Sequence, residues 1–272
     1  MMKHISFRMA LGLTLLVLIT AMAIFAPVLA PHSPTATTIN VLSLPSADHF
    51  LGTDQIGRDV FSRVLFGTRI SLQVGASAAV VAVLIGVPMG LVAGFFRGWI
   101  DFLIVQVIDI FIALPGLILA LIITAMLGPS IVNLAITLGV VSAPTVARLV
   151  RGQVFIVRET QFVEAARATG ASSFWVIRKH ILPNTMRVVW AQFAINVAFA
   201  IFTSASLSFL GLGVPPPAPD WGGMVRDGSM FLPIHPMLSL GPGAAVALTV
   251  FTFYLFGSSM NKAAGPKARR TE

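Results

Sequence analysis

Long apolar stretches alternate with polar segments along the chain. Six of them have, or approach, the roughly 20 residues that an α-helix needs to cross a hydrocarbon core about 30 Å thick. They cover residues 9–30, 72–95, 102–127, 130–149, 188–213 and 237–258. The pattern predicts an all-α membrane protein with six transmembrane helices.

The first stretch has a second interpretation, because a cleaved signal peptide is also apolar. Its end, Val28-Leu29-Ala30, loosely fits a small-residue cleavage site. The run exceeds the usual length of about 7–15 residues, and Pro31 follows the site directly. We therefore favour a transmembrane helix.

In the second stretch, Gly86, Gly90 and Gly94 recur at four-residue steps, a spacing that favours close packing against another helix.

Composition agrees with a membrane-embedded bundle. Only 10% of the 272 residues are charged and 56% are hydrophobic, whereas soluble domains carry about a quarter charged residues. There is no cysteine, which excludes disulfides, thiol catalysis and cysteine metal sites.

The formal net charge of +8 is explained by topology rather than by nucleic-acid binding. Six spans place both termini on one side of the membrane. With the termini inside, every lysine and arginine falls on the cytoplasmic side except Arg58, Arg63, Arg69 and Arg226. This bias predicts cytoplasmic termini and a cytoplasmic loop at residues 150–187.

The segment between the first two spans is rich in turn residues and then becomes amphipathic. Thr53 or Asp54 can cap a helix that lies flat on the membrane surface, although a loop packed on the bundle fits as well. Its apolar face would hold Ile56, Val60, Phe61, Val64 and Leu65, and its polar face Arg58, Asp59, Ser62 and Arg63.

The cytoplasmic loop carries two predicted short helices around a glycine. Thr160 can cap the first, Glu164 lies in its early turns, and Gly170 ends it. Ser172 or Ser173 can cap the second, and Pro183 is expected to end it. Its composition alone also fits an ordinary basic loop.

Spacing within this loop resembles the EAA loop of ABC-importer permeases, through Glu164, Ala165, Ala166, Gly170, Ile181, Leu182 and Pro183. In that family the loop forms a coupling helix that docks on a cytoplasmic ATPase. The resemblance implies coupling roles for Glu164, Ala165, Ala166, Arg167, Ala168, Gly170, Ala171 and Pro183.

Two outer segments resemble one branch of that family, the permeases of dipeptide, oligopeptide and nickel importers, in their shorter C-type. The segments are LGTD-x-x-GRD-x-x-SR at residues 51–63 and Pro-Asp-Trp-Gly at residues 219–222. The resemblance implies that Asp54, Gly57, Arg58, Asp59, Asp220 and Trp221 lie on the side of the substrate-binding protein.

The resemblance further implies the type I ABC-importer permease fold in a bacterial inner membrane. The expected divisions are an anchor and outer segment at residues 1–71, a five-helix core at 72–258 and a basic tail at 259–272. The expected partners are a second related permease, two ABC ATPases and a periplasmic or lipid-anchored binding protein. The tail lacks the acidic residues of family members, so no ATPase contact is carried over there.

No reactive cluster is evident, so an enzyme is not expected. No lysine follows a Gly-x-x-x-x-Gly pattern, so ATP and magnesium would be bound by partner ATPases. The five histidines are scattered without metal-ligand spacing, and no cofactor or metal is expected. The expected cargo is dipeptides or oligopeptides, with nickel or a metal chelate as alternatives and a secondary transporter as a rival class.

Few polar groups interrupt the spans. Asp109 is expected near the cytoplasmic surface, hydrated or paired, although Gln106 stands where family members often place an arginine partner. Asn196, Ser204 and Ser208 either line a pathway or bond neighbouring helices, and we favour helix packing.

Overall fold

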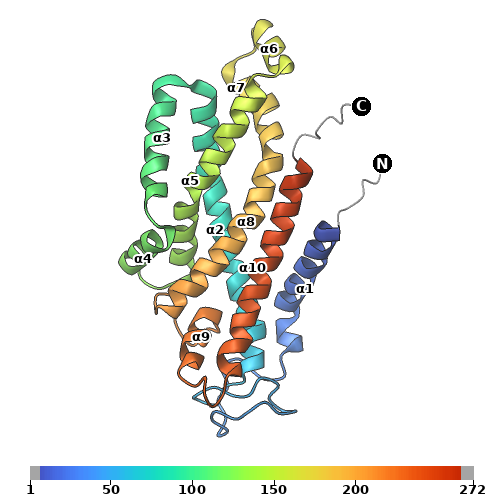
Figure 1. Ribbon diagram of the computed structural model, residues 1–272, viewed down its shortest axis with the longest axis vertical. Helices are drawn as coiled ribbons and strands as arrows, with labels where there is room; N and C mark the ends of the chain where they lie inside the picture. Colours follow the sequence, from blue (N-terminus) through green and yellow to red (C-terminus); the bar gives the residue numbers. More distant parts are fainter. Residues whose placement is uncertain (1–6, 265–272) are drawn as a thin grey trace.

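The computed structural model describes residues 7–264, which form an elongated bundle of helices (Figure 1). The described part contains no strand beyond one isolated bridge between Thr53 and Asp59. The helices are α1 (Phe7–Leu29), α2 (Val60–Phe96), α3 (Gly98–Ala113), α4 (Gly116–Leu127), α5 (Ile131–Arg158), α6 (Gln161–Ala168), α7 (Ser173–Val176), the π-helix η1 (Ile177–Ile181), α8 (Leu182–Phe209), α9 (Trp221–Ser229) and α10 (Met237–Ala264).

Five helices are long and apolar enough to cross a membrane, and α3 with α4 supplies a sixth span if the bent pair is counted as one. The predicted span over residues 102–127 is bent rather than continuous, because the chain turns by 91° between α3 and α4. The break lies at Leu114-Pro115. Proline disfavours helical geometry in the residue before it, and Leu114 is extended, with φ −86° and ψ 136°.

The prediction of a separate surface helix before residue 72 is also wrong. Pro88 is accommodated within the helix, and α2 runs from Val60 to Phe96 through 37 residues without a gap. Its N-cap is Asp59, whose carboxylate accepts a hydrogen bond from the Ser62 amide. The residues assigned to a polar outer face, among them Arg58 and Arg63, are instead buried.

The loop at residues 150–187 agrees in part with its prediction. Helix α6 is present, and Gly170 follows it in the left-handed conformation with φ +83°. The Thr160 hydroxyl donates to the Val157 carbonyl oxygen rather than capping α6. Ser172 caps α7 as expected, through its bond from the Trp175 amide.

Pro183, however, does not end the second helix. It lies in the first turn of α8, where a missing amide hydrogen matters least. The turn before it is the π-helix η1, and the chain continues as one helical run from Ser173 to Phe209. Helix α10 likewise extends to Ala264, past the expected start of the tail at residue 259; residues 265–272 of that tail lie outside the described part.

The three glycines of α2 allow its backbone to approach α5 closely. A Cβ atom on Gly86 would lie 2.6 Å from the carbonyl oxygen of Ala143, and one on Gly90 would lie 2.5 Å from that of Ala147. Gly94 faces Val154 in the same way. The packing role predicted from the four-residue spacing is therefore confirmed.

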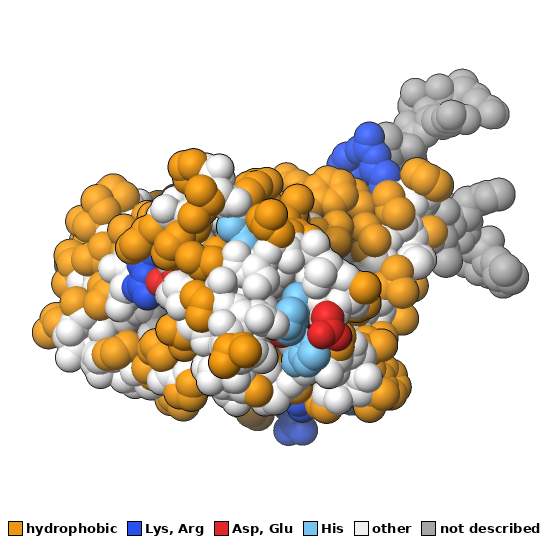
Figure 2. Space-filling model, turned by 90° about the horizontal axis from the view of Figure 1, so that it is seen from below, with side chains coloured by type: hydrophobic (Ala, Val, Ile, Leu, Met, Phe, Trp, Pro, Cys, Tyr) orange, Lys and Arg blue, Asp and Glu red, His pale blue; other side chains and the backbone are white. Residues whose placement is uncertain are grey.

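The two ends of the bundle differ. Helices α6 and α7 lie at the end where α1 begins and α10 finishes, while α9 and the loop after α1 lie at the opposite end (Figure 1). Seen from that opposite end, the surface is polar at its centre, with histidine and acidic side chains, and hydrophobic around its edge (Figure 2).

We predict that Gly90→Ala destabilises the fold, because its methyl group would overlap the Ala147 carbonyl oxygen. Thermal unfolding of the purified protein in detergent should show a loss of about 1–3 kcal/mol, typical of an overpacked contact. The matched control is Gly152→Ala, also within a helix but with open space around the added atom; it should be neutral or stabilising. Equal behaviour of the two variants would contradict the packing argument.

Candidate functional site

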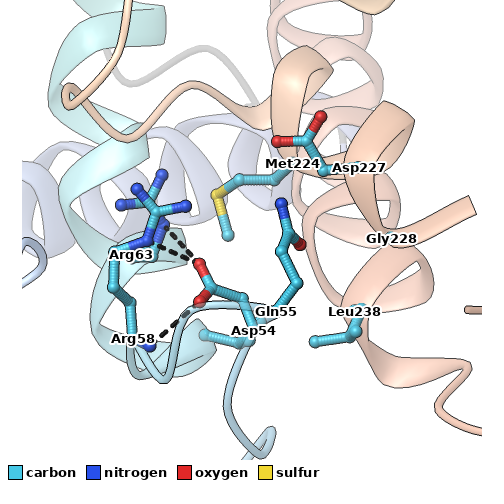
Figure 3. A pocket seen from close by; sticks show the side chains of 9 residues that line it. Asp54, Gln55, Arg58, Arg63, Met224, Asp227, Gly228 and Leu238 are labelled. Carbon is cyan, nitrogen blue, oxygen red and sulfur yellow. Dashed lines mark hydrogen bonds and ion pairs between the residues drawn. The ribbon is translucent and has the colours of Figure 1, made fainter. Parts of the chain in front are cut away.

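The end that carries α9 and the loop after α1, predicted to face outward and called the outer end below, is held by a buried network at the start of α2 (Figure 3). The Asp54 carboxylate accepts hydrogen bonds from the Arg58 amide at 2.9 Å and from Arg58 Nε at 2.6 Å. Arg63 Nε lies 3.9 Å from the same carboxylate. Because all three side chains are largely shielded from water, this network fixes the path of the chain into α2.

Two further contacts attach this end to the C-terminal half of the chain. Trp221 is buried and donates its indole N–H to the Val64 carbonyl oxygen at 2.9 Å. His235 Nε2 lies 2.8 Å from the Ser43 carbonyl oxygen. Of the predicted outer residues, Asp54, Gly57, Arg58, Asp59, Asp220 and Trp221 are all buried, so they shape this end rather than present side chains on its surface.

The structure brings together two histidines that seemed unrelated in the sequence. One potential ligand atom each from His32, His49 and Asp59 lie within 4.8 Å of one another, and these residues could hold a metal ion. Hydrogen bonds already occupy the group: His49 Nδ1 lies 2.9 Å from Asp59 Oδ1, and His32 Nε2 lies 2.9 Å from the Asp48 carbonyl oxygen. Sequence spacing does not indicate this group, because its residues come from three separate points of the chain.

Asp220 begins α9 and lines a cavity of about 200 Å³ between α2, α9 and the loop after α8. Burial raises the pKa of its carboxyl group, and the hydrogen bond from the Gly223 amide, 2.8 Å from Oδ2, opposes that rise. Arg58, Arg63 and Arg226 also line the cavity. The cavity therefore combines three guanidinium groups with carboxylates at the outer end.

The opposite end presents the predicted coupling residues on its surface. Glu164, Ala165, Arg167, Ala168 and Gly170 are exposed, while Ala166 and Ala171 are half-buried. Val163 anchors α6 in the core beside Val176 of α7. The large side chains of Phe174 and Trp175 are exposed next to this small-residue face. The predicted residues of α6 thus lie together, whereas exposed Pro183 belongs to the start of α8.

The polar residues within the spans do not form a single site. Asn196 lines a cavity at the bend between α3 and α4, and Ser208 lines the outer cavity. Twelve helical residues separate them, about 18 Å along α8. Asp109 is paired, as expected, with its partner Arg148 on α5, and Arg151 on the same helix holds Asp101 by two hydrogen bonds.

Comparison with known proteins identifies the family. Residues 86–270 match the family described as "Binding-protein-dependent transport system inner membrane component". This chain belongs to that family. Residues 9–45 of the permease also match the "N-terminal TM domain of oligopeptide transport permease C".

Relatives of similar length support the assignment. The permease is 40% identical to the dipeptide transport system permease protein of Alkalihalophilus pseudofirmus, over 95% of this chain and 85% of that protein. It is 39% identical to a glutathione transport system permease protein of Escherichia coli O6:K15:H31, over 98% of this chain and 88% of that protein.

Solved structures confirm the fold. The inward-facing MetNI methionine ABC transporter aligns with a TM-score of 0.63 at 18% identity, over 76% of this chain and 98% of that chain. An amino acid ABC transporter crystallised with histidines aligns with a TM-score of 0.56 at 18% identity, over 75% and 94%. The prediction of an ABC-importer permease with the type I fold is confirmed.

We predict that Asp59→Ala destabilises the permease, because it removes the N-cap of α2 and leaves buried His49 without its partner. Loss of a cap and of a buried hydrogen bond together should lower the free energy of unfolding by about 2 kcal/mol or more. Asp48→Ala, at an exposed neighbouring position, is the control and should change little. A similar small effect for both would argue against the capping role.

A second prediction concerns pH. Because the folded-state pKa of Asp220 is raised above its ordinary 3.8, the folded protein holds this proton more tightly than the unfolded chain. The stability that protonated Asp220 contributes is fully present below pH 3.8 and is lost as the pH rises through the folded-state pKa.

Asp220→Asn should remove this part of the pH dependence while keeping a good helix cap. The free energy of unfolding of both proteins, measured in detergent from about pH 4 to pH 7, tests this prediction. The range is chosen because a carboxyl group with a raised pKa begins to titrate within it. An identical pH dependence in the two proteins would show that burial of Asp220 does not destabilise its charge.

Proposed function

We propose that this permease forms half of the translocation pathway of an ATP-driven importer of dipeptides or oligopeptides. The observation that carries the proposal is the exposed small-residue face of α6. Helix α6 is anchored by buried Val163 and is followed, after one turn, by the continuous helix that crosses the bundle. Ala165 and Ala168 are exposed one turn apart on α6 and let a partner approach closely beside the larger Glu164 and Arg167. The anchoring of α6 would join that partner to the transmembrane helices.

The proposed orientation puts α6, α7 and both termini in the cytoplasm. The distribution of lysine and arginine supports this orientation. It is consistent with the arrangement in Figure 1, where α6 and α7 lie at the end at which α1 begins and α10 finishes. The outer end, with the loop after α1 and α9, would then face the binding protein.

The proposed assembly contains a second related permease, two ABC ATPases and a periplasmic or lipid-anchored binding protein. ATP and magnesium would be held by the ATPases, which would press on the α6 face as they close. We infer roles in this contact for Glu164, Ala165, Ala166, Arg167, Ala168, Gly170 and Ala171, whereas Pro183 would act by shaping the start of α8. The buried outer residues would keep the docking end in shape.

The proposed cargo follows from the relatives. The two relatives described above are named for dipeptide and glutathione transport, and both cargoes are short peptides. This favours peptides over nickel. The choice among peptides would rest with the binding protein, because it delivers the cargo.

We predict that Ala165→Trp uncouples transport, because an indole would hold a partner away from the α6 face. In the complex reconstituted in lipid vesicles, binding-protein-stimulated ATP hydrolysis should fall by about tenfold or more, the effect of losing ~1.4 kcal/mol of contact energy. Glu164→Lys should act in the same direction.

The matched control is Asn261→Trp, which adds the same bulk at an exposed position near the end of α10, away from α6. It should retain stimulation. Unchanged stimulation in Ala165→Trp would remove the coupling role, and failure of the purified permease to bind any ATPase would overturn the proposed assembly.

A further inference from the structure

A cavity of about 350 Å³ lies where α3 and α4 bend away from the bundle. It is bordered by α3, α4, α5 and α8, and its walls are mostly apolar. The polar groups that reach it come from two helices: Ser142 and Thr145 on α5, and Gln192 and Asn196 on α8. A mainly apolar cavity with a few convergent polar groups is the usual form of a small-molecule site.

Two of these polar groups are buried without a partner. Asn196 is 4% exposed and Ser142 is 7% exposed. Asn196 Oδ1 accepts a hydrogen bond from Gln192 Nε2 at 2.9 Å, but Asn196 Nδ2 and Ser142 Oγ have no partner among the described residues. Such groups are costly in a membrane-spanning bundle, so a donor and an acceptor from a ligand would stabilise both.

The bend adds backbone groups to the same cavity. Leu114 and Gly116 line it, on either side of Pro115. The carbonyl groups in the last turn of α3 lose their helical partners at this break. Broken helices at a transmembrane cavity are the arrangement by which transporters offer backbone groups to cargo.

An ion pair lies next to the cavity. Asp109 precedes Ile112 of the lining by three residues, and Arg148 follows Thr145 by three residues, so each lies about one helical turn away. The two side chains pair with each other across α3 and α5. In the proposed orientation they stand on the cytoplasmic side of the cavity.

We propose that this cavity binds the peptide during its passage, an inference that rests on the function proposed above. Asn196 and Ser142 bind an amide group of the peptide, Phe111 and Phe199 contact its side chains, and Asp109 with Arg148 forms a charged inner border for its termini. The described residues that line the cavity include no carboxylate, imidazole or thiol, so it suits a peptide rather than a bare metal ion.

The absence of cysteine from the chain makes a direct test possible. Ser142→Cys places a single thiol in the cavity wall. Thr137→Cys is the matched control, because Thr137 also lies on α5 and has a buried, unpartnered hydroxyl, but it is not among the residues that line this cavity. Both variants are assembled into the full complex in lipid vesicles, and labelling of this chain by a small methanethiosulfonate is followed by mass.

Labelling at Ser142→Cys should slow by about tenfold when both ATP and dipeptide-loaded binding protein are added. This is the effect expected for a site protected by ~1.4 kcal/mol of binding. Empty binding protein with ATP should give no protection. Labelling at Thr137→Cys should not respond to peptide. If Ser142→Cys is unreactive in every state, a neighbouring helix fills the cavity and the inference is overturned.

A second variant separates this inference from the proposed function. Asn196→Leu keeps the volume of the side chain but removes its amide. An amide group of the bound peptide would then lack a hydrogen-bond partner, so the KM for dipeptide uptake should rise by about tenfold. Wild-type uptake of dipeptide with an unchanged KM in Asn196→Leu would overturn the cavity assignment alone. Absence of dipeptide uptake by the wild-type complex would overturn the proposed function itself.

Discussion

Close approach of the α2 and α5 backbones is the contact on which the rest of the bundle depends. Glycines in α2 face carbonyl oxygens and valines of α5, so neither helix can shift without losing contact along several turns. The same core continues to the end that carries α6, where Val163 of α6 and Val176 of α7 pack into it. The α6 face that we propose as the ATPase contact is thus an extension of the central helix pair rather than a loose loop.

The outer end reaches the same stiffness by different chemistry. There a hydrophobic cluster that includes Val60, Trp221 and Leu238 is supplemented by buried ion pairs and backbone hydrogen bonds along a series of turns. Asp54 fixes two arginines, Asp59 caps α2, and Trp221 bonds to the backbone of α2. Helix α2 therefore begins in a polar network and ends in an apolar core, with both ends held.

Most of the architecture could be predicted from the sequence, since apolar length decides which segments can cross a membrane. The α6 motif was readable because small residues and Gly170 have local conformational consequences. Three features could not be predicted from the sequence. Whether Pro115 breaks a helix and Pro183 is accommodated depends on neighbouring turns and tertiary packing, and the pairing of Arg148 with Asp109 depends on helix positions in space. The grouping of His32 with His49 was missed for the same reason.

The helical run from Ser173 to Phe209 has a mechanical consequence. Its 37 residues would make a rod of roughly 55 Å, with the α6 contact near one end and Asn196 some 35 Å along it. A tilt of about 10° that pivots at the α6 end of the rod would carry Asn196 by ~6 Å, more than one helical pitch. The π-helical turn η1 lies near the base of this rod. Bending there would let the rod tilt while α6 keeps its place, so the proposed contact between α6 and a partner would need no large rearrangement.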